Sequence, residues 1–166
     1  MEANIEISVI YSEKEIKKAV SFYILRVCDM RTYALIIYPI LIIAIVLSLV
    51  FRDFALLSFI YFFIGAILFY FYYYRPIRAY LKLYMKRKGE HYCFDKDRVL
   101  ITGEEFKSEC LWSILKKAYE IPSAFLLLDD NKSIYIFPKT CFSSTQILEQ
   151  MRNLLALKFP DIKSYK

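Results

Sequence analysis

Two long runs of apolar residues follow one another in the first half of the chain. Thr32–Val50 and Phe54–Tyr74 contain no charged side chain, and only three residues separate them. At 1.5 Å per helical residue, each run spans about 30 Å, which is the thickness of the hydrocarbon core of a bilayer. The pattern therefore predicts a transmembrane helical hairpin over residues 32–74.

Three other interpretations of these runs are weaker. A signal peptide would begin nearer the N-terminus than residue 32, and no second span would follow it at once. A buried hairpin in a soluble protein would need a much larger domain around it than this chain can supply. A channel or transporter subunit usually carries ionisable side chains within its spans, and both runs lack them.

The segment before the hairpin, residues 1–31, changes from one periodicity to another. Ile5–Tyr11 places apolar residues at alternate positions, which predicts a half-buried strand. Ser12 and Glu15 have the spacing of a capping box, and the apolar positions that follow recur at helical spacing to about Cys28. We therefore expect a cytoplasmic strand followed by an amphipathic helix.

The segment after the hairpin begins with a second amphipathic pattern. Residues 75–89 combine apolar positions at helical spacing with a run of basic residues, and a glycine ends the pattern. We expect a basic helix directly beside the membrane.

Residues 90–166 predict a small antiparallel β domain closed by a C-terminal helix. Short alternating or apolar stretches separated by turn residues mark the expected strands: His91–Phe94, Arg98–Thr102, Glu105–Trp112, Leu115–Ile121, Ala124–Leu128 and Ser133–Phe137. A last helix is expected to begin at Ser143 or Ser144 and to end before Pro160. The fold class is therefore a membrane α+β protein with a small barrel or bent sheet covered by one helix.

The net charge of +6 is concentrated in one place. Acidic and basic residues balance in every other part of the chain, whereas the basic helix carries six cations and no acid. This strip is a candidate site for anionic lipid headgroups: Arg75, Arg78, Lys82, Lys86, Arg87 and Lys88. The distribution gives no reason to expect nucleic-acid binding. The same strip and the five cations before the hairpin place both termini in the cytoplasm by the positive-inside rule.

The sequence offers little catalytic chemistry. The four cysteines have no metal-ligand spacing, and we expect them to be reduced thiols. His91 is the only histidine, and its pairing with Cys93 along one strand is a common arrangement without catalytic meaning. We therefore expect no enzyme activity, no catalytic residues, no metal site and no cofactor.

Two residues of the β domain are candidates for contact with a partner. Trp112 is interpreted first as a core or edge residue, and second as an anchor for a protein partner. Lys139 is interpreted first as a solvated turn residue, and second as a contact for an anionic group together with Lys116 and Lys117.

Three stretches of the β domain carry a resemblance to a known family: Phe94–Thr102, Trp112-Ser113 with the four residues after it, and Phe137-Pro138-Lys139 leading to Phe142. Through them, and most strongly through Pro138–Phe142, the chain resembles the YcxB-like proteins over about residues 1–160. The resemblance implies a bacterial membrane protein whose soluble part is similar to a pleckstrin-homology (PH) domain. It also implies that Ile5–Tyr11 joins the sheet of residues 90–137, with the hairpin as an insertion. No catalytic residues carry over.

These observations predict a non-enzymatic protein of the bacterial inner membrane. Its PH-like cytoplasmic domain would bind a lipid or an unknown protein at the membrane surface, and the chain could form a homo-oligomer. The alternative, which rests on a general likeness to small membrane proteins of this kind, is an immunity protein that protects against a membrane-active toxin.

Overall fold

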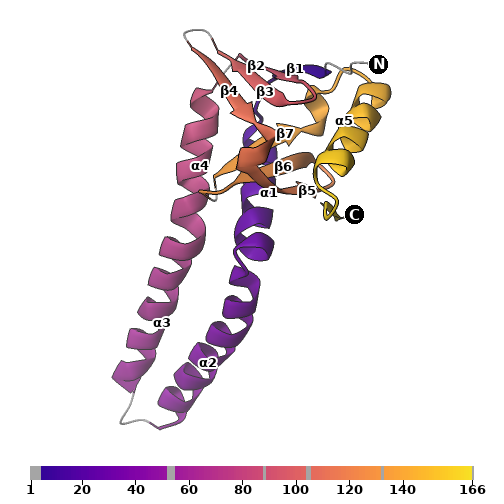
Figure 1. Cartoon of the computed structure of the whole chain (residues 1–166). Helices are drawn as coiled ribbons and strands as arrows, with labels where there is room; N and C mark the ends of the chain where they lie inside the picture. Colours follow the sequence, from indigo (N-terminus) through magenta and orange to yellow (C-terminus); the bar gives the residue numbers. More distant parts are fainter. Residues whose placement is uncertain (1–4, 52–54, 88, 104–105, 132, 166) are drawn as a thin grey trace. The chain divides into compact units, whose positions relative to one another are not determined.

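The computed structural model describes residues 5–51, 55–87, 89–103, 106–131 and 133–165. These residues form two compact units, one made of the chain up to Ala19 together with the chain from Lys82 onward, and the other of Val20–Leu81. Figure 1 shows the elements of both. Each unit is considered by itself.

The unit Val20–Leu81 contains the two long apolar helices. Helix α1 (Glu13–Phe22) leads through the π-helical turn η1 (Tyr23–Val27) to α2 (Met30–Val50). Helix α3 (Ala55–Phe69) leads through a second π-helical turn, η3 (Tyr70–Tyr74), to α4 (Arg75–Lys86). The predicted spans are thus confirmed as helices; α3 continues through η3 into α4, whereas Cys28 and Asp29 separate η1 from α2.

Both helices are long and apolar enough to cross a membrane. Mean hydropathy reaches 2.2 over Met30–Ser48 and 1.9 within Leu56–Lys86, and few of these side chains are buried. Pro39 lies inside α2. Gly65 faces Leu41 across the pair, because a Cβ added at Gly65 would lie 3.5 Å from its Cδ1. An added Cβ would make only an ordinary van der Waals contact there, so the packing of the two helices does not require a glycine at this position.

The other unit contains two sheets. The first has the order β1-β2-β3-β4, and the second has the order β7-β6-β5-β8. The bounds of the strands are β1 Ile5–Val9, β2 Glu90–Phe94, β3 Arg98–Thr102, β4 Lys107–Leu111, β5 Leu115–Glu120, β6 Ala124–Asp129, β7 Ile134–Pro138 and β8 Lys163–Ser164. Helix α5 (Thr145–Lys158) begins after Ser144, whose side chain accepts a hydrogen bond from the Ile147 amide.

The N-terminal strand pairs with a strand from the far side of the hairpin in the sequence. Strand β1 runs antiparallel to β2, with Ile5 opposite Phe94 and Val9 opposite Glu90. Its alternation is the predicted one, since Ile5, Ile7 and Val9 are buried and the residues between them are exposed. The expectation that the hairpin interrupts one β domain is therefore confirmed.

One strand pairing differs from the predicted antiparallel order. Strand β8 runs parallel to β5, with Tyr119 opposite Lys163. The sequence after Pro160 has no alternation of apolar and polar residues that would predict a strand. The strand β8 forms because the edge of β5 offers unpaired backbone groups.

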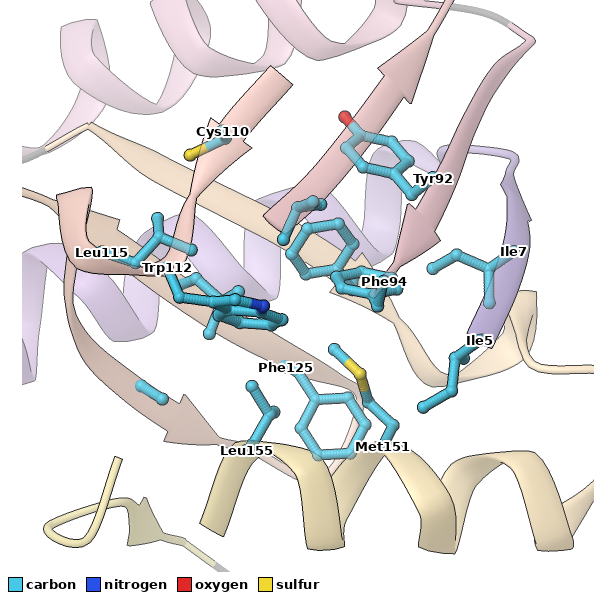
Figure 2. Packing of buried hydrophobic residues seen from close by; sticks show 14 of the residues in the cluster. Ile5, Ile7, Tyr92, Phe94, Cys110, Trp112, Leu115, Phe125, Met151 and Leu155 are labelled. Carbon is cyan, nitrogen blue, oxygen red and sulfur yellow. The ribbon is translucent and has the colours of Figure 1, made fainter. Parts of the chain in front are cut away.

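The core lies between the sheets and α5 (Figure 2). Apolar side chains from β1, β2 and β3 meet those of β5, β6 and β7, and Met151 and Leu155 of α5 are completely buried among them. Phe94 and Phe137 pack edge to face with their ring centroids 5.1 Å apart. Because both sheets contribute to one cluster, the domain cannot lose either sheet without exposing the core.

Candidate functional site

Helix α4 separates its basic and apolar residues onto opposite faces. Arg75, Arg78, Lys82 and Lys86 are exposed, and their spacing of three, four and four residues confines them to about 80° of the helix circumference at 3.6 residues per turn. We call these four residues the cationic stripe. Ile77 and Tyr84, seven residues apart, are buried on the other face.

The remaining two residues of the predicted strip do not belong to this stripe. Arg87 is only 35% exposed, lies 3.9 Å from the Glu90 carboxylate, and places its guanidinium 5.5 Å from the centre of the Tyr84 ring. Lys88 lies outside the described residues. The structure thus brings four of the six predicted cations together and directs Arg87 toward the β domain.

Arg87 belongs to a polar cluster around Glu90. The Glu90 side chain is 3% exposed and accepts a hydrogen bond of 2.5 Å from the Tyr92 hydroxyl, which lies 3.5 Å from the Tyr11 hydroxyl. Burial raises the pKa of Tyr11 to about 12, and burial also raises the pKa of Tyr92. Both phenols therefore stay protonated at neutral pH, and the Tyr92 hydroxyl donates a hydrogen bond to the Glu90 carboxylate.

Trp112 lies in the core of the β domain. It is 7% exposed, its indole Nε1 donates a hydrogen bond of 2.8 Å to the Asp95 carbonyl, and its ring packs against Phe94 and Phe159. One edge of the ring borders a cleft of about 760 Å³ beside β5 and the chain after α5. The cleft is lined by four lysines and one acid: Lys116, Lys117, Lys158, Lys163 and Asp161.

The cleft brings Trp112, Lys116 and Lys117 together, whereas the second interpretation of Lys139 had grouped that residue with Lys116 and Lys117. Lys116 donates to the Ser113 carbonyl at 2.9 Å and lies 3.5 Å from Asp130. Lys117 is exposed. Lys139 is not one of the residues that line the cleft.

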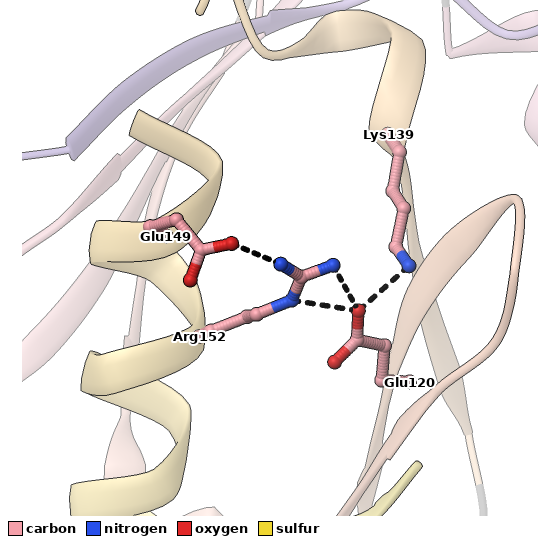
Figure 3. A network of polar contacts seen from close by, with 4 residues as sticks. All are labelled: Glu120, Lys139, Glu149 and Arg152. Carbon is pink, nitrogen blue, oxygen red and sulfur yellow. Dashed lines mark hydrogen bonds and ion pairs between the residues drawn. The ribbon is translucent and has the colours of Figure 1, made fainter. Parts of the chain in front are cut away.

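Lys139 instead joins a network of ion pairs that links β5, the 3-10 turn η5 (Lys139–Cys141) and α5 (Figure 3). Its ammonium lies 2.7 Å from Glu120 Oε1 and 5.3 Å from the centre of the Phe125 ring. Arg152 of α5 donates to the same oxygen at 2.8 Å and also pairs with Glu149. At 18% exposure, Lys139 is largely shielded from solvent.

The charges of this network control the ionisation of Glu120. Burial by itself raises the pKa of this carboxyl, but hydrogen bonds from Arg152 and Lys139 reverse that effect and hold the pKa below its usual value. Glu120 therefore carries a negative charge at neutral pH, and it fastens α5 to the second sheet.

We expect Glu120→Gln to lower the free energy of unfolding by about 1–2 kcal/mol, because the substitution leaves Lys139 without its counter-charge and Arg152 with Glu149 alone. Urea unfolding of the full chain in detergent, at neutral pH and at acidic pH, would measure this. The pKa of Glu120 is lower in the folded state than in the unfolded state. Its contribution to the free energy of unfolding is therefore complete above the unfolded-state pKa and is lost as the pH falls through the folded-state pKa. The free energies of unfolding of the variant and the wild type should thus become equal in acid. Glu149→Gln is the matched control, because Glu149 is 54% exposed and pairs with the same arginine; equal losses from the two substitutions would contradict the proposed role of Glu120.

A serine–histidine pair lies on the outer face of the first sheet and was missed in the sequence. The β1–β2 register places Ser8 opposite His91, and Ser8 Oγ lies 2.8 Å from His91 Nδ1. Both residues are exposed, and such cross-strand pairs commonly stabilise sheets. Only the pairing register could have revealed this contact, because the residues lie on either side of the hairpin in the sequence.

Metal-binding groups do not gather in the part of the chain that the structure describes. Among those residues, no group of three or more His, Cys, Asp and Glu side chains is placed to hold an ion. The four cysteines are all free thiols. Burial raises the pKa of Cys93, Cys110 and Cys141, which keeps these thiols protonated and weakly reactive.

Part of the chain matches the model of a known protein family. The family model described as YcxB-like protein matches residues 94–155, which extend from the end of β2 into α5 and include Trp112 and Lys139. No curated protein and no solved structure matches the chain. The match supports the resemblance seen in the sequence over residues 94–155.

Proposed function

We propose that this chain is a non-enzymatic protein of the bacterial inner membrane, inserted through α2 and α3 with both termini in the cytoplasm. Its cytoplasmic part is a PH-like domain, and the cationic stripe of α4 binds anionic lipid headgroups. The observation that carries the proposal is the separation of the two faces of α4, where four exposed cations lie opposite buried Ile77 and Tyr84.

Exposure of the apolar helices supports insertion. Large side chains along both helices are more than half exposed within their unit, for example Leu35, Ile43, Phe59 and Phe62. Side chains of this kind in water would form an apolar surface far larger than soluble monomers carry. In a bilayer the same surface faces lipid tails at no such cost.

Position along the chain supports the role of the stripe. Helix α4 directly follows η3 and α3, so the stripe begins where a span through the bilayer would end. A basic residue near an anionic membrane surface contributes about 1 kcal/mol, so four such residues would strengthen the contact by roughly a thousandfold. The tyrosines of η3 would lie at the level of the headgroups, where aromatic side chains are common.

The β domain supports a PH-like assignment through its architecture. Two mainly antiparallel sheets share one core, and a single C-terminal helix packs against it. The four lysines of the basic cleft beside Trp112 would attract an acidic protein partner.

The stripe can be tested with the full chain in lipid nanodiscs. Insertion is checked first: the chain should resist alkaline carbonate extraction, and a cysteine at Phe51→Cys in a cysteine-free background should react from the outside of intact cells. Hydrogen exchange of the α4 amides should then be slower in phosphatidylglycerol than in phosphatidylcholine. Replacing Arg75, Arg78, Lys82 and Lys86 with glutamine should remove this difference, because the headgroups lose their counter-charges.

The control is a variant that loses four positive charges on the β domain instead of on α4. Lys96, Lys107, Lys117 and Lys163 are exposed on the β domain, and their replacement by glutamine should preserve the lipid effect. If this control removes the effect and the stripe variant keeps it, lipid binding lies on the β domain and the proposal for α4 is wrong.

The second candidate, an immunity protein, is favoured by the apolar surface of α2 and α3, which a toxin acting within the bilayer would meet. A toxin gene beside this one, with protection on co-expression, would establish it. Absence of protection would dismiss it.

A further inference from the structure

Two π-helical turns occur in the unit Val20–Leu81, one on each side of the helix pair. The turn η1 (Tyr23–Val27) precedes α2, and η3 (Tyr70–Tyr74) follows α3. Single π turns are rare in helices and are frequent at functional sites. Both contribute residues to one groove, since Ile24 and Leu25 of η1 and Tyr72 and Tyr73 of η3 line the same space.

The groove is apolar along its whole length. It encloses about 610 Å³, which is within the usual size range of small-molecule sites. Its lining residues are Ile24, Leu25, Met30, Tyr33, Ala34 and Ile37 on one side, with Tyr38, Leu68, Phe69, Tyr72 and Tyr73 completing it. Tyrosine hydroxyls are the only polar side-chain groups among these residues, so the occupant must itself be mainly hydrocarbon.

The chain changes direction beside this groove. Asp29 adopts a left-handed backbone with φ of 56°, the only positive φ at a non-glycine residue among those described. Its carboxylate accepts a hydrogen bond of 2.8 Å from the Thr32 hydroxyl, and α2 begins at Met30. α2 is therefore not a continuation of the helix before it, and Leu25 and Met30, which lie on either side of this break in the sequence, both line the groove. The small side chain of Ala34 leaves further room.

Positive charge lies next to the apolar lining. Arg26 follows Leu25 and Arg31 follows Met30, and both arginines are exposed. Asp29 is the one acid nearby in sequence, and its carboxylate is engaged with Thr32. An occupant with a hydrocarbon tail and an anionic head matches both the lining and these charges.

We propose that the groove holds an acyl chain of an anionic phospholipid, with the phosphate of its headgroup near Arg26 and Arg31. The proposal rests on the insertion of the hairpin proposed above, but it uses different residues from the cationic stripe. The stripe would contact many exchanging headgroups, whereas the groove would retain a single lipid molecule.

Native mass spectrometry of the full chain in detergent, with phosphatidylglycerol or phosphatidylcholine added, tests this site. We expect one phosphatidylglycerol to be retained. Ala34→Trp fills the groove and should reduce the retained lipid at least tenfold. Leu35→Trp is the matched control, because Leu35 is 64% exposed and does not line the groove; it should retain lipid as the wild type does.

A double variant tests the headgroup. Arg26→Gln with Arg31→Gln should still bind lipid but should lose the preference for phosphatidylglycerol, whereas the glutamine variant of the cationic stripe should keep that preference. Thermal unfolding of each variant checks that it is folded.

Three results would overturn the proposal. These are equal lipid retention by the two tryptophan variants, equal retention of both lipids by the wild type, and a dimer that Ala34→Trp converts to a monomer. The last result would assign the groove to a second copy of the chain. If the hairpin does not insert, alkaline carbonate should release the chain from membranes. This result distinguishes a failure of the proposed insertion from a failure of the lipid site.

Discussion

Trp112→Ala is expected to lower the free energy of unfolding of the β domain by about 3–5 kcal/mol. The ring is 7% exposed and packs against Phe94 and Phe159, so its removal leaves a cavity between the first sheet and the end of α5. The substitution also leaves the Asp95 carbonyl without its hydrogen bond from the indole. A loss of this size is a large part of the stability of an ordinary domain.

Hydrogen exchange of the β-strand amides in the full chain would measure this loss, since it needs no tryptophan signal. Trp112→Phe is the control: it keeps a ring in the core, removes the indole N–H, and should cost about 1–2 kcal/mol from the lost hydrogen bond together with some loss of packing. A loss below about 1 kcal/mol for the alanine variant would contradict the structural role of Trp112.

This expectation affects any search for a partner. A binding assay that removes Trp112 would report loss of the folded domain, whether or not the residue contacts a partner. Lys117→Glu is the better probe of the cleft, because Lys117 is exposed and its substitution changes only the charge of the surface.

The stability of the β domain is expected to fall steeply at alkaline pH. Burial raises the pKa of Tyr11 from its ordinary value of 10.0 to about 12, and the pKa of Tyr92 is raised as well. The folded state therefore binds more protons than the unfolded state above pH 10. The contribution of these phenols to the free energy of unfolding is complete below the pKa that they have in the unfolded state. It is lost as the pH rises toward the higher pKa that they have in the folded state. For Tyr11 alone the loss is about 2–3 kcal/mol.

Urea unfolding at a series of alkaline pH values would measure this loss. Lysine side chains also titrate there, so the wild type must be compared with Tyr11→Phe, in which the fall in stability should be smaller. Tyr165→Phe is the control and should follow the wild type. A Tyr11→Phe curve parallel to that of the wild type would show that this phenol does not control the alkaline transition.

Periodicity and charge predicted most of the elements. The strands from β2 to β7 and the helices α4 and α5 lie close to their expected positions, because alternation, turn residues and an N-cap serine mark them locally. The pairing of β1 with β2 came from the resemblance, since no local signal joins residues on either side of the hairpin.

Contacts between distant residues could not be predicted in this way. Lys139 looked like a solvated turn residue, but Glu120 and Arg152, distant in the sequence, meet it in a partly buried network. The groove depends on two π turns and on the backbone of Asp29, which leave no distinct pattern in a run of apolar residues. The basic cleft needed β8, a strand of two residues that pairs only because β5 offers an edge.

The pairing of β1 with β2 also sets an order of events during synthesis. Ile5 cannot meet Phe94 until the ribosome has made both apolar helices and the basic helix after them. In the proposed topology, the nascent N-terminal strand would wait at the cytoplasmic face while the hairpin enters the bilayer. The first sheet would then form only after insertion of the hairpin is complete. A chain whose synthesis stops within the hairpin would carry an unpaired β1 strand, which chaperones and proteases could bind.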